Sequence, residues 1–167
     1  MTPERQSLQH FLGAVAYRAQ KALRGAPASF PDFSAGQQTR SPVEILRHMT
    51  SVLGYARTLF VGGSYPRHPE PLPTFAAEID RFHQVLEGLA RELDAGTPLR
   101  EVAERQLLQG PLSDVMTHIG QLALLRRLAG SPVPPENFLF ADVRADRLGA
   151  DQPRPARPDD EWPERPA

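Results

Sequence analysis

Apolar residues recur along this chain at intervals of three and four, and four stretches of this pattern predict four amphipathic helices. The first three cover residues 4–23, 42–61 and 74–93. The fourth is Gln109–Gly130, and its apolar face consists of Leu112, Val115, Met116, Ile119, Leu122 and Ala123. No alternation of apolar and polar residues lasts long enough to build a sheet. The pattern therefore predicts an all-α four-helix bundle with one long crossover connection.

Two of these helices begin with recognisable signals. Ser41 is suited to cap the second helix, Pro42 fits its first position, and Glu44 completes a capping box. Pro111 is expected at the first turn of the fourth helix, and Gly130 is expected where that helix stops. The helix boundaries are thus predicted by residue chemistry as well as by periodicity.

The distribution of proline and charge divides the chain into two parts. Residues 1–148 are assigned to the bundle, and residues 149–167 form a tail rich in Pro, Arg and Asp. Residues 136–140 are expected to pack back onto the bundle, and residues 141–148 are a candidate for a short helix. Such a tail composition is typical of disorder unless contacts hold it, and Trp162 is the expected anchor.

Composition excludes several classes of protein. The chain has no cysteine, which excludes disulfides, thiolate nucleophiles and cysteine zinc sites. Nineteen basic and twenty acidic residues give a net charge of −1, so no overall field favours nucleic acid. No apolar run is long enough to span a membrane, and the N-terminus lacks the pattern of a signal peptide. We expect a cytoplasmic protein that binds neither nucleic acid nor membrane.

Polar residues that suit a metal lie beside the apolar faces of two helices. Asp114, His118 and Gln121 follow one another at helical spacing in the fourth helix, and His48 lies on the apolar side of the second. Bundles place metal sites between facing helices. Two imidazoles and one carboxylate suit a catalytic zinc ion with an open position, a nickel ion or a non-haem iron. The proline-rich connector over residues 64–73 is expected to lie over one end of the bundle.

The same residues also have an ordinary structural interpretation. In this interpretation His48 and His118 are separate core histidines, and Asp114 is an acidic residue favoured near the start of its helix by unpaired amides. In that case the two imidazoles do not converge. Three further histidines are weaker candidates for an additional ligand: His10, His68 and His83.

One set of residues also carries a family resemblance. It comprises His48 in the second helix and, in the fourth, Leu112, His118, Gly120, Gln121, Leu125, Arg126 and Gly130. In its order and helix types this set resembles the DinB/YfiT-like superfamily of four-helix bundles. The resemblance implies an up-down-down-up arrangement over the bundle and a divalent metal (zinc, nickel, iron or manganese) held by His48, Asp114 and His118. It departs from the family at Asp114, which stands where the first histidine of a His-x-x-x-His pair is expected.

The resemblance implies two competing functions. The first is a metal-dependent enzyme acting on a small molecule, either an S-transferase using a low-molecular-weight thiol or a hydrolase, with Gln121 contacting the bound ligand. The second is a non-catalytic binding or stress-associated bundle with a degenerate metal site. A homodimer is expected. Asp114 is the residue on which the choice depends, because it can act as a ligand, orient His118, or mark a site that no longer holds metal.

Overall fold

The computed structural model describes residues 2–159, which form an all-helical bundle with no strand beyond one isolated bridge between Glu136 and Pro158. Trp162, the expected anchor of the tail, lies outside the described residues. No helix in the described range is both long enough and apolar enough to cross a membrane. The helices are α1 (Pro3–Leu23), α2 (Pro42–Val61), α3 (Phe75–Asp94), α4 (Glu104–Leu107) and α5 (Ser113–Leu128).

The first three helices begin and end within a residue of the positions expected from the sequence. The capping box at the start of α2 is confirmed, since the Glu44 carboxylate accepts a hydrogen bond from the Ser41 amide at 2.8 Å and the Ser41 hydroxyl accepts from the Glu44 amide. Gly62 ends the helix with a φ of 79°, a left-handed conformation that glycine adopts without steric cost. The capping box at Ser41 fixes where α2 starts, and it therefore also fixes which face of the helix carries His48.

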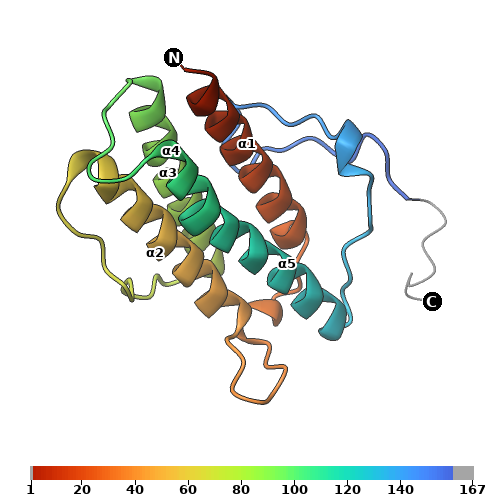
Figure 1. The fold of residues 1–167 in the computed structure, drawn as a ribbon. Coiled ribbons are helices and arrows are strands. Elements are labelled where there is room, and N and C mark those ends of the chain that lie inside the picture. Colours follow the sequence, from red (N-terminus) through yellow and green to blue (C-terminus); the bar gives the residue numbers. More distant parts are fainter. Residues whose placement is uncertain (1, 160–167) are drawn as a thin grey trace.

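The long helices pack around one apolar core (Figure 1), with α1 and α2 each contacting α3 and α5. Ion pairs show that α2 and α3 are parallel. Arg47 near the start of α2 pairs with Glu78 near the start of α3 at 2.6 Å, and Arg57 pairs with Glu92 near their other ends at 2.9 Å. Consecutive parallel helices need a connection that crosses the length of the bundle, which agrees with the expected long crossover.

The expected helix start at Pro111 is wrong. The helical segment begins at Glu104, and Pro111 lies inside a wide π-helical segment, Leu108–Leu112, that joins α4 to α5. Proline lacks an amide hydrogen and clashes with the preceding turn of an α-helix, and the wider π turn accommodates both defects. The Ser113 hydroxyl donates to the Leu108 carbonyl at 2.6 Å within this turn.

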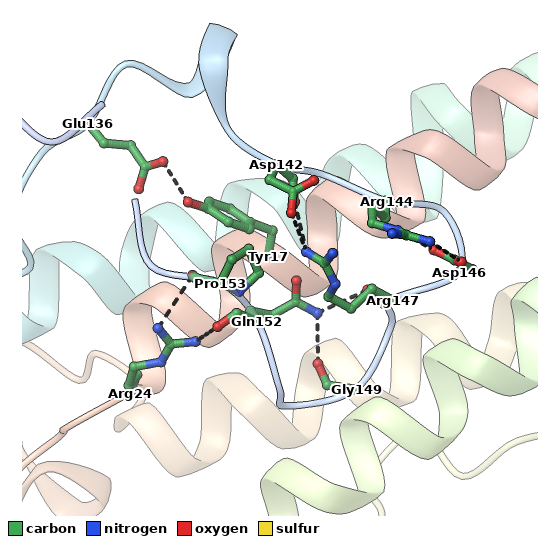
Figure 2. Close-up of polar contacts among 10 residues, drawn as sticks. All are labelled: Tyr17, Arg24, Glu136, Asp142, Arg144, Asp146, Arg147, Gly149, Gln152 and Pro153. Atoms are coloured by element: carbon green, nitrogen blue, oxygen red, sulfur yellow. Dashed lines mark hydrogen bonds and ion pairs between the residues drawn. The ribbon is translucent and has the colours of Figure 1, made fainter. Parts of the chain in front are cut away.

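Residues 131–159 return along α1, as Figure 2 shows. The expected packing of residues 136–140 is found only in part: Glu136 is buried and the Phe138 ring contacts Tyr17, but Leu139 and Phe140 are exposed. The Tyr17 hydroxyl donates to the buried Glu136 carboxylate at 2.7 Å, and the Arg24 guanidinium donates to the Gln152 carbonyl. On α3, His83 Nδ1 donates to the Leu148 carbonyl at 2.6 Å. These contacts tie the segment to both helices.

The candidate short helix over residues 141–148 is not present. That segment is irregular, with one turn at residues 145–146, and it carries an ion pair between Arg144 and Asp146 at 2.7 Å and another between Arg147 and Asp142 at 2.9 Å. The backbone of Arg144 lies directly against Gly13 of α1, where any larger side chain would overlap it. Gly13 therefore permits the close approach of this segment to α1.

Candidate metal centre

Two helices supply the three side chains that the sequence analysis assigned to a metal. His48 comes from α2, whereas Asp114 and His118 come from the first turns of α5, and these two helices pack against each other. One potential ligand atom of each residue lies within 4.8 Å of the other two. The interpretation of His48 and His118 as separate core histidines is wrong, because their ring centroids are 4.7 Å apart.

The Asp114 carboxylate contacts both imidazoles. Its Oδ2 is 3.6 Å from His48 Nε2, and its Oδ1 is 3.3 Å from His118 Nδ1. His118 Nδ1 also lies 2.8 Å from the main-chain oxygen of Asp114. A carbonyl only accepts hydrogen bonds, so Nδ1 carries the proton and the lone pair remains on Nε2. Hydrogen bonds of this kind orient the histidines of metal sites and fix their tautomer.

The site is closed on the His118 side and open on the Asp114 side. The side chain of His118 is 10% exposed, that of His48 30% and that of Asp114 44%. Burial lowers the pKa of His48, and the positive charge of Arg40 and the neighbouring His118 imidazole lower it further, against the opposing effect of Asp114. His48 is therefore neutral near pH 7, which is the form that binds a metal ion.

The chemistry of the donor set fits a divalent cation. With metal–ligand bonds of about 2.0–2.2 Å, two ligands of a tetrahedral site lie about 3.4 Å apart. The 3.6 Å between His48 Nε2 and Asp114 Oδ2 is close to that separation. The ligand atoms of the three residues all lie within 4.8 Å of one another, so side-chain rotations alone can bring them to metal-binding distance. Three protein ligands leave at least one coordination position for a ligand or water.

The remaining histidines and Gln121 do not belong to this group of side chains. Gln121 lies one turn beyond His118 on α5 with its side chain exposed, and its contact with a bound ligand stays a prediction. His10 and His68 are exposed, and His83 of α3 is buried, with its Nδ1 bonded to the Leu148 carbonyl. None of the three joins His48 in a metal-ligating group within residues 2–159.

Next to His48 is a cleft of about 460 Å³. Part of its wall is the proline-rich connector, whose residues 67–71 line it together with Arg40, Glu44 and Arg47. The connector therefore lies beside the metal candidate, over the end of the bundle where α2 begins. Sequence analysis did not identify Arg40 or the connector's charged residues as part of the site, because nothing in their spacing relates them to His48.

Glu78 holds the connector in place. This fully buried residue of α3 accepts a hydrogen bond from the Leu72 amide at 2.9 Å and pairs with Arg47 and Arg81. Burial alone raises the pKa of Glu78, but the Leu72 hydrogen bond and the two arginines outweigh it and lower that pKa overall. The ionised carboxylate thus links the start of α2, the start of α3 and the connector. The sequence signal for the role of Glu78 was the position of this charged residue within the apolar face of α3.

Comparisons with protein-family models, with curated proteins and with solved structures found no match for this chain. The described residues therefore define a helical bundle with a His–Asp–His group, and its geometry is the basis for the function proposed below.

Proposed function

We propose that this protein is a divalent-metal-dependent enzyme that acts on a small molecule and is a member of the DinB/YfiT-like superfamily. The convergence of His48, Asp114 and His118 from two helices carries this proposal. Two imidazoles and a carboxylate with an adjacent cleft form an arrangement typical of catalytic rather than structural metal sites, which are closed by four protein ligands.

Two further observations support the superfamily assignment. Parallel α2 and α3, as their ion pairs indicate, are what an up-down-down-up arrangement requires. His48 and His118 also lie on the two helices from which the superfamily takes its ligands. Asp114 replaces a histidine of the family pattern, and its carboxylate lies where it can serve as the third ligand.

The proposed reaction is either the S-transfer of a low-molecular-weight thiol or a hydrolysis. A bound zinc, nickel, iron or manganese ion would lower the pKa of a thiol or a water molecule and so generate a nucleophile at neutral pH. His118 is fixed by its hydrogen bond to the Asp114 carbonyl, which keeps Nε2 available. Gln121 is assigned to hydrogen-bond the ligand, and the connector limits the access of solvent to the cleft beside His48.

Metal analysis of protein purified without an affinity tag tests the proposal. We expect close to one metal ion per chain in the natural protein, and a large loss in both His48→Ala and Asp114→Ala. His10→Ala is the matched control, because His10 is exposed on α1 and contacts none of the three residues. An unchanged metal content in His48→Ala, or no metal after incubation with zinc and manganese, would overturn the proposal.

One observation favours the alternative of a dimeric, non-catalytic bundle. Leu124 and Leu128 of α5 are more than half exposed, and they lie one turn apart on the same face. A second copy of the chain would cover them. Light scattering separates the alternatives when combined with metal analysis: a dimer without metal supports the binding protein, and a metal-loaded chain of either size supports the enzyme.

A further inference from the structure

Two arginines, Arg40 and Arg67, line the cleft beside His48. Arg40 precedes α2, and Arg67 lies in the connector. Within residues 2–159 neither guanidinium makes a hydrogen bond or an ion pair. The volume of about 460 Å³ is in the range of small-molecule sites, which lie between about 300 and 1,000 Å³.

The backbone that carries Arg67 is fixed on both sides. The Ser51 hydroxyl donates to the Pro66 carbonyl at 2.8 Å, and the Arg81 guanidinium donates to the Glu70 carbonyl at 2.8 Å. Pro66 and Pro69 flank Arg67 and His68 and further restrict the backbone of this stretch. Arg67 is thus presented to the cleft from a preorganised segment, so little backbone entropy is lost when a ligand binds.

Three arginines and two glutamates line the cleft. Arg47 is paired with a buried glutamate of α3, and the Glu44 carboxylate accepts the Ser41 amide in the capping box of α2. Arg40 and Arg67 therefore lie beside the carboxylates of Glu44 and Glu70 with their guanidinium donors unused within residues 2–159. A cation held by His48, Asp114 and His118 would add positive charge beside this cleft.

We propose that Arg40 and Arg67 bind an oxyanion, a carboxylate or a phosphate, at one end of the small molecule whose other end reaches the His48 site. A guanidinium presents paired donors that match either group, which a single lysine would not. The part of this inference in which the small molecule also reaches the metal rests on the proposed function. The binding of the oxyanion by the two arginines does not require the metal.

The test is a titration of the full chain with succinate and, separately, with inorganic phosphate at low ionic strength, followed by NMR of the backbone amides of Arg67, His68, Glu70 and Leu72. The two probes distinguish a carboxylate from a phosphate ligand. We expect Arg67→Gln and Arg40→Gln each to weaken binding about tenfold, as loss of a charge-assisted hydrogen bond does. Arg105→Gln is the matched control, because Arg105 is exposed on α4 away from the cleft.

Glu70→Gln provides a change of the opposite sign. It removes one of the two carboxylates that line the cleft, so we expect it to tighten binding severalfold. Titrations are run on zinc-loaded and on chelator-treated protein. Arginine-dependent binding in both states supports the inference even if the metal proposal fails. Binding that needs zinc and is equally strong in Arg67→Gln and the natural protein would overturn the oxyanion inference but leave the metal proposal standing. The absence of a response to either probe would also overturn the oxyanion inference.

Discussion

Replacement of Glu78 by glutamine is the perturbation with the largest expected effect on the scaffold of the site. It leaves Arg47 and Arg81 without their carboxylate and weakens the anchor of the Leu72 amide. Breaking a fully buried ion pair costs about 3–5 kcal/mol, and the two arginine side chains here are 22% and 18% exposed, so solvent compensates part of the loss. We expect Glu78→Gln to lower the free energy of unfolding by about 2–3 kcal/mol.

Thermal denaturation followed by circular dichroism measures this effect. A chain of this size loses about 2–4 °C of Tm per kcal/mol, so we expect a decrease of about 4–12 °C at pH 7. Glu92→Gln is the control, because Glu92 pairs with an arginine that is 45% exposed, and such pairs contribute below about 1 kcal/mol. Equal Tm values for the two variants would refute the reasoning.

The pH dependence of the Glu78 effect has a definite sign. The folded state holds the pKa of Glu78 below its ordinary value of about 4.3, so the stabilisation is complete above that pH and is lost as the pH falls through the folded pKa. The difference in Tm between the natural protein and Glu78→Gln should therefore shrink below about pH 4.3. A difference that stays constant down to pH 2.5 would contradict the assignment.

Three further predictions concern packing, protonation and metal binding. Gly54→Ala should lower the free energy of unfolding, measured by urea denaturation, by about 1–3 kcal/mol, because the new methyl group would overlap the Tyr65 ring. Gly120→Ala, whose methyl group meets open space, should raise it by about 0.5–1 kcal/mol. Burial lowers the pKa of His83, so the unfolded chain takes up the proton first, and stability should fall as the pH drops below about 6.5; His83→Gln should flatten that dependence. Asp114→His, which restores the family's histidine pair, should keep metal binding in equilibrium dialysis, while Asp114→Asn should weaken it at least about tenfold.

Much of the scaffold was predictable because its signals are local. The cap at Ser41 and Pro42 places the start of α2, and helical periodicity then puts His48 on the side that faces the core. The four-residue spacing of Asp114 and His118 places them on one face of α5 by the same reasoning. Because α2 and α5 both have one apolar face, their packing brings these three residues together.

Other features depend on tertiary contacts that sequence spacing does not encode. Pro111 was assigned to a first turn, but the helix continues past it because a π turn accommodates a residue that has no amide hydrogen. The cleft joins Arg40 and Arg67 only through the path of the connector, which the buried Glu78 fixes from another helix. Residues 141–148 have helix-compatible composition but are irregular, and their backbone lies against α1 at Gly13, a long-range contact that sequence spacing does not reveal.

The most direct test of the metal centre is X-ray absorption at the edge of the metal that the purified protein carries, or of zinc after loading. The proposal predicts two imidazole nitrogens and a carboxylate oxygen at about 2.0–2.2 Å, with one imidazole lost in His118→Ala. A first shell made only of water and carboxylate oxygens, unchanged in His118→Ala, would contradict the proposed site.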